Sequence, residues 1–145
     1  MKILFLNGPN LNMLGTREKS IYGDLTLDDI NKKIESECKK NNVEAEFYQS
    51  NIEGELINKI HSANNEFFGI VFNPGAYSHY SLALHDAIKS IQIPVIEVHI
   101  SNVFAREEKR CEMVTAKASI GVISGFSYNS YILGLYGLLG IKASQ

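Results

Sequence analysis

Residues 94–110, PVIEVHISNVFAREEKR, begin with an apolar run that predicts a buried strand over Pro94–Ile100. Two polar residues, Glu97 and His99, interrupt that run. Residues two apart on a strand point to the same face, so these side chains should lie side by side. A carboxylate in an apolar strand is unfavourable unless it is paired. Beside an imidazole, it would fix the orientation of the ring and favour its protonated form.

The segment after this strand adds Ser101, Asn102, Arg106 and Arg110. The two arginines are four apart, which on a helical turn would place them on one face. On this stretch alone, a core histidine satisfied by its neighbour, followed by two solvated arginines, explains the pattern as well as a functional site does. The rest of the chain has to decide between these interpretations.

The composition indicates one soluble globular domain over residues 1–145. The chain is 45% hydrophobic and 21% charged, which is ordinary for such a domain. Its net charge of −2 provides no basic surface for nucleic acid or an anionic membrane. We expect no signal peptide and no membrane span, and two isolated cysteines predict neither a disulfide scaffold nor a zinc site. The expected location is the cytoplasm.

Apolar periodicity predicts five strands that alternate with helices. The expected strands are 2–7, 43–49, 67–73, 94–100 and 119–124, and the expected helices are 26–41, 50–64, 78–91 and 129–142. Thr26 with Asp29, and Ser50 with Glu53, have the spacing of capping boxes. Most strands are continuous apolar runs, which indicates a parallel sheet covered on both faces. The fold class is therefore α/β, a flavodoxin-like doubly wound sheet in the order 2-1-3-4-5.

The last helix is apolar nearly all round, and glycines recur on it every three residues, at 134, 137 and 140. Such glycines allow close packing. A helix of this kind lies either in the core or at a contact between subunits.

Polar residues concentrate where the first, third and fourth strands end. In a sheet of this order, ligands bind beyond the carboxyl ends of the strands, near the first and third. The candidates are Asn10, Arg17 and Tyr22 after the first strand, Asn73 and His79 after the third, and His99, Arg106 and Arg110 after the fourth. Scattered surface polarity would not gather in this way, so the pattern favours a site.

The connection over residues 8–26 is unusually long for a compact domain. Its polar and aromatic residues lie between glycines, which predicts a mobile lid over about residues 15–24. A merely flexible loop is the alternative. Phosphate-binding glycine motifs, the paired acids of a phospho-acceptor and metal-ligand spacings are all missing from the sequence. The arginines, tyrosine, histidines and amides that remain suit a small hydroxylated anion and proton transfer without a metal or cofactor.

Three segments resemble the signature segments of the type II 3-dehydroquinate dehydratases. They are GPNLNMLGTREKSIYG, NPGAYSHYSLALHDA and IEVHISNVFAREEKR, in the order of that family and at its spacing. The resemblance extends from Met1 to about Gly137. It implies a lyase that dehydrates 3-dehydroquinate to 3-dehydroshikimate through an enolate, without a cofactor, in the shikimate pathway or in quinate catabolism.

The resemblance also implies a role for each site residue. Tyr22 would take a proton from C2, Arg17 and Arg106 would stabilise the developing charge, and Asn10 would position a water. His99, set by Glu97, would protonate the leaving hydroxyl. The residues that would hold the substrate are Asn73, His79, Ile100, Ser101 and Arg110, with Asp86 supplied by a neighbouring subunit. The implied assembly is a dodecamer built of trimers.

Some positions depart from the pattern of that family, namely His85, Lys109 and the run Cys111–Val114. They put subunit packing and tuning in question more than activity. By itself, Asp86 is most simply a solvated acid on a helix. A different class of function also stays open, a non-catalytic α/β module that binds a small hydroxylated carboxylate. Tyr22 separates the two, because a simple binding module has no use for a tyrosine near an arginine on a mobile loop.

Overall fold

The computed structural model describes residues 1–16 and 18–145, and its centre is a five-stranded parallel sheet in the order β2-β1-β3-β4-β5. The strands are β1 (Lys2–Asn7), β2 (Glu44–Gln49), β3 (Gly69–Asn73), β4 (Val95–His99) and β5 (Gly121–Ser124). Every residue of β3 and β4 is buried, whereas the edge strands β2 and β5 are partly exposed. The predicted fold class and strand order are confirmed.

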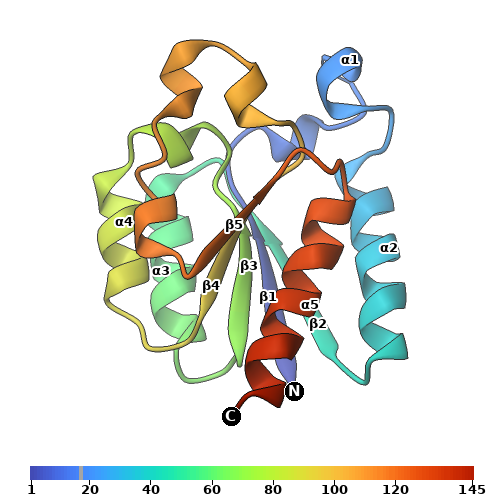
Figure 1. The fold of residues 1–145 in the computed structure, drawn as a ribbon, viewed down its shortest axis with the longest axis vertical. Coiled ribbons are helices and arrows are strands. Elements are labelled where there is room, and N and C mark those ends of the chain that lie inside the picture. Colours follow the sequence, from blue (N-terminus) through green and yellow to red (C-terminus); the bar gives the residue numbers. More distant parts are fainter. Residues whose placement is uncertain (17) are drawn as a thin grey trace.

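Helices cover both faces of the sheet (Figure 1). They are α2 (Leu27–Lys40) and α5 (Asn129–Ala143) on one face, and α3 (Glu53–Ala63) and α4 (Leu82–Lys89) on the other. Successive strand residues point to opposite faces. Phe5 therefore packs in the core under α2 and α5, while Leu6 packs in the core under α3 and α4.

Two of the three glycines of α5 bring this helix close to the sheet. A Cβ atom at Gly134 would stand 2.9 Å from Val71 Cγ1, and one at Gly137 would stand 2.6 Å from Ile96 Cδ1. At Gly140, a Cβ would meet no described atom within 4 Å. Close packing is thus confirmed for two glycines, and α5 lies in the core along that side.

The start of α2 is capped as predicted. Thr26 Oγ1 accepts a hydrogen bond from the Asp29 N–H, and the Asp29 carboxylate accepts one from the Thr26 N–H, both at 3.1 Å. The capping box predicted for Ser50 and Glu53 is wrong. Residue Ile52 precedes α3, so Ser50 lies too early, and its hydroxyl accepts from the Ile52 N–H instead.

The helix predicted to start near Ser78 starts later, at Leu82, where Ser81 caps it by accepting from the Leu84 N–H. The preceding residues form a short 3-10 helix, η2 (Gly75–His79). The cause is the carbonyl of Ser78, which accepts from the N–H groups of Val114 and Thr115 and is therefore not available to continue a helix.

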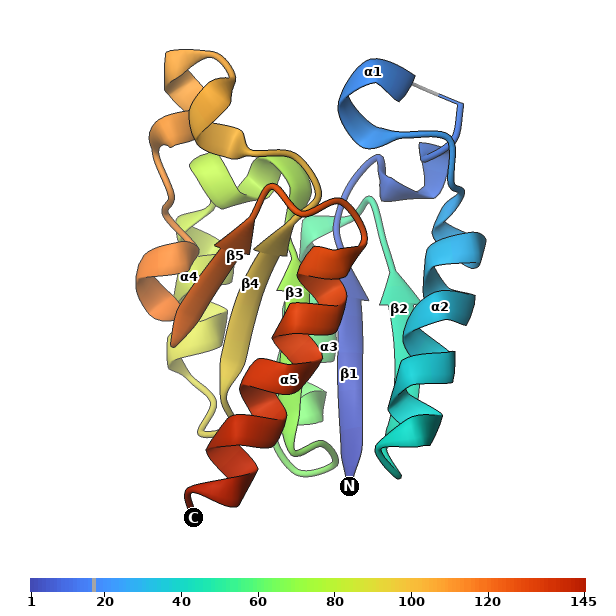
Figure 2. The ribbon, with the colours of Figure 1, turned by 45° about the vertical axis from the view of Figure 1, so that its right-hand side comes forward.

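Further short helices lie in the connections: α1 (Lys19–Tyr22), η1 (Leu11–Met13), η3 (Val103–Ala105), η4 (Glu108–Cys111) and η5 (Ala116–Ala118). Figure 2 shows α1, η3 and η4 beyond the arrowheads of the strands, which all point to one end of the molecule. In the part of the chain that the structure describes, no helix is long and apolar enough to cross a membrane.

Candidate active site

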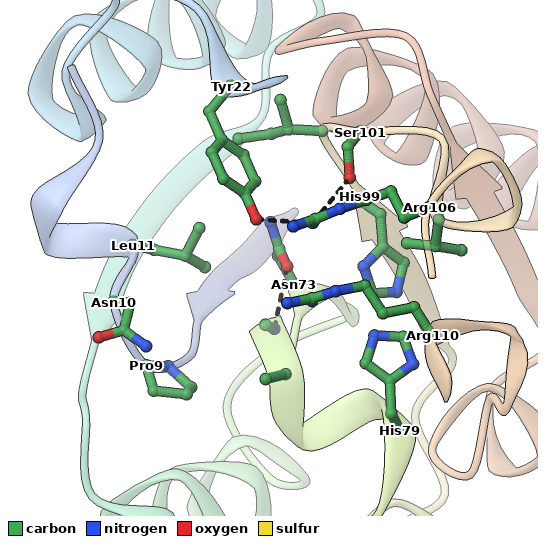
Figure 3. A pocket seen from close by; sticks show the side chains of 14 residues that line it. Pro9, Asn10, Leu11, Tyr22, Asn73, His79, His99, Ser101, Arg106 and Arg110 are labelled. Carbon is green, nitrogen blue, oxygen red and sulfur yellow. Dashed lines mark hydrogen bonds between the residues drawn. The ribbon is translucent and has the colours of Figure 1, made fainter. Parts of the chain in front are cut away.

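One pocket lies beyond the carboxyl ends of β1, β3 and β4 (Figure 3). It encloses about 550 Å³, solvent at its mouth included, which suits a small molecule. Nine of the predicted site residues line it: Asn10, Tyr22, Asn73, His79, His99, Ile100, Ser101, Arg106 and Arg110. Arg17 lies outside the described residues. The structure therefore brings together residues from three connections that are far apart in the sequence.

Gly8 holds two of these connections together. Its N–H donates to the Asn73 carbonyl at 2.8 Å, and a Cβ here would stand 2.4 Å from the Pro74 carbonyl oxygen. A larger residue would force the loops apart. Asn10 follows with a φ of 68°, a left-handed conformation that asparagine adopts more readily than most residues. Its N–H donates to Asn51 Oδ1 at 2.9 Å, and Figure 3 shows Asn10 across the pocket from the two arginines.

The predicted pairing of Glu97 and His99 is confirmed. His99 Nε2 lies 2.8 Å from Glu97 Oε2, and the two residues are 4% and 0% exposed. Because the carboxylate accepts, Nε2 carries the hydrogen, and Nδ1 is left as the nitrogen that can exchange a proton with a ligand. Glu97 does not line the pocket; it acts from behind the ring.

The second histidine, His79, has a different partner. Its Nδ1 lies 2.7 Å from the Glu112 carbonyl oxygen, which can only accept, so Nδ1 carries the hydrogen and Nε2 is an acceptor when the ring is neutral. Burial lowers the pKa of His79 below its usual value, and the nearby His99 and Arg110 lower it further. The two imidazole rings, with centroids 6.1 Å apart, therefore have different partners, a neutral carbonyl for His79 and a carboxylate for His99.

Tyr22 reaches the pocket from α1 and meets Arg106. Arg106 Nη1 donates to the Tyr22 hydroxyl oxygen at 2.7 Å, and its guanidinium carbon lies 5.3 Å from the centre of the Tyr22 ring. The same nitrogen is 3.4 Å from Ser101 Oγ. A positive charge at this distance stabilises a phenolate more than a phenol. The guanidinium charge of Arg106 thus lies directly at the Tyr22 oxygen.

A buried chain of hydrogen bonds fixes Asn73. The Gly75 N–H donates to Asn73 Oδ1, so Asn73 Nδ2 must donate to the Tyr131 oxygen, at 2.9 Å, and the Tyr131 hydroxyl donates to Asn7 Oδ1, at 2.6 Å. Burial raises the pKa of Tyr131, so its hydroxyl keeps the proton. The second N–H of Asn73 is left for the pocket, where it can only donate.

The prediction that Arg106 and Arg110 share a helical turn is wrong. η3 ends at Ala105, Arg106 is extended, and η4 starts afresh at Glu108. Both guanidinium groups still reach the pocket (Figure 3). Arg110 is oriented by Glu107, whose carboxylate accepts from Arg110 Nε at 2.7 Å.

Asp86 does not reach this pocket. It lies on α4 with an 80% exposed side chain, beside His85, at 3.0 Å. His79 belongs to a different element, η2, so the two residues do not lie on one helix. Of the positions that depart from the resemblance, Lys109 and Cys111 are exposed on η4.

Sequence reasoning missed three supporting residues, Ser78, Thr115 and Tyr131. All are fully buried, and their hydroxyls bond to Glu97 or to Asn73. The sequence held one signal for Tyr131, since a hydroxyl group on an otherwise apolar helix indicates a buried hydrogen-bond partner. The partner of a buried hydroxyl depends on tertiary contacts, so a single sequence could not identify it.

Comparison with known proteins gives a consistent result. The model of the family described as Dehydroquinase class II matches residues 1–139. The chain is 56% identical, over 138 residues, to the 3-dehydroquinate dehydratases of Clostridium acetobutylicum and Caldicellulosiruptor bescii, covering 95% and 94% of this chain and 96% and 95% of those relatives. The crystal structure of the type II dehydroquinase from Butyrivibrio crossotus superposes with a TM-score of 0.94 at 50% identity, covering 96% of this chain and 97% of that one. This chain belongs to the class II dehydroquinase family.

Proposed function

We propose that this chain is a hydro-lyase that removes water from 3-dehydroquinate to give 3-dehydroshikimate, in the shikimate pathway or in quinate catabolism. The names of its relatives give the substrate. The observation that carries the proposal is the pairing of two opposite proton-transfer groups in one pocket: Tyr22 beside the Arg106 cation, and His99 against the Glu97 anion.

The first step is removal of a proton from C2, next to the ketone. The Tyr22 phenolate takes this proton and becomes a phenol, and the C–H electron pair passes into an enolate. Arg106 donates to the Tyr22 oxygen at 2.7 Å and so stabilises the anion before the transfer. In this mechanism Arg17 supplies a second positive charge, and Asn10 positions a water at the enolate oxygen.

The second step expels the hydroxyl. The enolate electrons return to form the carbon–carbon double bond while the bond from carbon to the leaving oxygen breaks. Protonated His99 gives its Nδ1 proton to that oxygen, which leaves as water, and Glu97 steadies the ring through Nε2. Solvent then returns a proton to His99 and takes one from Tyr22. Both steps are proton transfers between substrate and side chains, so the mechanism requires no cofactor.

The remaining residues of the pocket hold the substrate. Asn73 offers an N–H and neutral His79 offers a lone pair, so we assign the first to an accepting oxygen and the second to a substrate hydroxyl. Arg110 and the backbone of Ile100 and Ser101 complete the contacts with the carboxylate and hydroxyls.

The assembly and location are also part of the proposal. Asp86 is exposed and does not line its own pocket, which suits a residue that reaches the site of a neighbour in trimers that form a dodecamer. We place this assembly in the cytoplasm. Residues 15–24 would close over the substrate as a lid.

The proposed shared sites can be tested by mixing subunits. Combining Asp86→Ala subunits with His99→Ala subunits, under conditions that allow exchange, should restore some activity. No recovery would count against shared sites.

Formation of the conjugated enone, followed by ultraviolet absorbance with 3-dehydroquinate as substrate, tests the activity. Tyr22→Phe should lose turnover by roughly 10²-fold or more, since a general base contributes that much. Tyr136→Phe is the matched control, because its hydroxyl bonds to Glu37 outside the pocket. If the unaltered chain binds 3-dehydroquinate without forming the enone, it is a binding module and the proposal is wrong.

A further inference from the structure

Glu97 has no exposure to solvent, yet it carries a carboxylate at the centre of β4. Of the described residues, three donate to it. Ser78 Oγ donates to Oε2 at 2.7 Å, His99 Nε2 donates to the same oxygen at 2.8 Å, and Thr115 Oγ1 donates to Oε1. Ser78 and Thr115 are themselves fully buried.

These donors decide which form of Glu97 is stable. An isolated carboxylate is strongly disfavoured when it is removed from water. Hydrogen bonds donated to both oxygens favour the anion, because a neutral carboxyl group would have to place its own hydrogen where one of the donors stands. Thr115 is the described donor on Oε1, so losing its hydroxyl would leave that oxygen buried without a described partner.

The two hydroxyls are also fixed to each other through the backbone. The Ser78 carbonyl accepts from the N–H groups of Val114, at 2.7 Å, and Thr115, at 3.3 Å. The same segment supplies the Glu112 carbonyl that orients His79. The segment 112–115 thus supplies the partner of His79, the Glu112 carbonyl, and also contacts the partner of His99, the Glu97 carboxylate.

We propose that Thr115, supported by Ser78, is a positioning residue that keeps Glu97 an anion facing His99, and so keeps His99 protonated when it must act as the acid. The inference rests on the proposed function, in which His99 protonates the leaving hydroxyl. Thr115 itself does not line the pocket, so it acts through Glu97 and has no contact with the substrate.

Other titratable and charged groups lie near His99, and the cationic ones make this support necessary. His79 stacks near it from η2, Arg106 and Arg110 reach the pocket from the segment after β4, and Tyr22 reaches it from α1. The two guanidinium groups disfavour a further cation beside them. Glu97, which accepts from His99, supplies a negative charge that offsets them.

The test compares Thr115→Val, which keeps the shape without the hydroxyl, with Thr115→Ser, which keeps the hydroxyl. The kcat of each is measured across pH with 3-dehydroquinate. For Thr115→Val we expect kcat to fall about tenfold or more, with KM within about threefold, because the acid acts only in the transition state. The pH above which kcat declines should move lower, since His99 loses its proton more easily. Thr115→Ser should recover most of both losses.

Ser130→Ala is the control for loss of a buried hydroxyl, because Ser130 accepts from the Phe126 N–H outside the pocket and should affect stability alone. If Thr115→Val does not fold, Ser78→Ala provides the test, because it removes the hydroxyl that donates to the other carboxylate oxygen of Glu97, Oε2. An unchanged pH profile in a folded variant, whatever its stability, would overturn the inference. An inactive parent would instead contradict the proposed function.

Discussion

On one side of the pocket, His99, the proposed acid, lies at the end of a central strand, and buried donors hold its partner Glu97 on both oxygens. On the other side, Tyr22, the proposed base, lies on a helix of four residues between backbone conformations of positive φ, at Glu18 and Gly23, and is only partly buried. His99 thus belongs to a strand of the buried sheet, whereas Tyr22 belongs to the connection between β1 and α2.

The difference suits the two proton transfers of the proposed mechanism. An acid that lies near guanidinium groups needs an anion fixed beside it, and a buried strand provides this rigid setting. A base that meets a substrate as it enters the pocket can be carried by a connection. Arg106 joins the two sides, because it follows β4 and contacts Tyr22 from α1.

The largest effect is expected from replacing His99, the proposed acid. His99→Gln should lower kcat by roughly 10²- to 10⁴-fold, the usual contribution of a general acid, while KM stays within about threefold. Steady-state kinetics checks this, with His61→Gln as the control, since His61 is exposed on α3. A raised KM with unchanged kcat would make His99 a binding residue.

Removing the link between the sides should cost less. Arg106→Ala should lower kcat by about 10²-fold, the typical effect of losing one donor to a developing anion. Arg106→Lys should recover part of this loss, because it keeps the charge but not the planar fork. Lys109→Ala removes a positive charge from the same connection at an exposed position and should be nearly neutral. Equal effects of Arg106→Ala and Lys109→Ala would mean that only overall charge matters.

Replacing Tyr131 removes a buried support of the pocket without changing a residue that we propose to transfer protons. Tyr131→Phe leaves Asn7 and Asn73 without their shared hydroxyl, both in buried positions, and should cost about 1–3 kcal/mol of unfolding free energy. It should also raise KM several-fold, because Asn73 is no longer held for the substrate. Urea unfolding and kinetics measure the two effects, and Tyr136→Phe is the control. Lower stability with unchanged KM would confine Tyr131 to the fold.

The same comparison explains what could be predicted from the sequence. The Glu97–His99 pair follows from strand periodicity alone, because neighbours on one face of a strand need no tertiary information. The sheet order follows from continuous apolar strands and the rules of crossover connections. The roles of Tyr22 and Arg106 came from family resemblance, since no local rule places two connections together.

The wrong predictions also have specific physical causes. The start of α4 was predicted too early because the Ser78 carbonyl accepts hydrogen bonds from Val114 and Thr115. These residues lie more than thirty positions away in the sequence, so no local pattern shows the contact. The arginines were assigned to one helix because spacing alone does not reveal that η3 ends at Ala105. In both places a tertiary contact or a break in the backbone overrides the local signal.

The smallest expected effect is the contribution of His79 to the pH dependence of stability. Burial, with His99 and Arg110 nearby, lowers the pKa of His79 below its value in the unfolded chain. At a pH above the unfolded value of about 6.5, both states carry a neutral ring and its stabilisation is complete. As the pH falls below that value, the unfolded chain binds a proton that the fold resists, so stability decreases until the folded group also titrates.

Urea unfolding at about pH 7.5 and about pH 5.5 measures this slope, with the protein concentration held fixed because association would shift the midpoint. Other groups contribute to the slope, so the informative quantity is the difference between the parent and His79→Gln, which has no ring to protonate. The parent should lose more stability on acidification than this variant does. Equal losses in the two proteins would mean that His79 accepts a proton in the fold as easily as in the unfolded chain. The proposal that neutral His79 accepts from a substrate hydroxyl would then have to be abandoned.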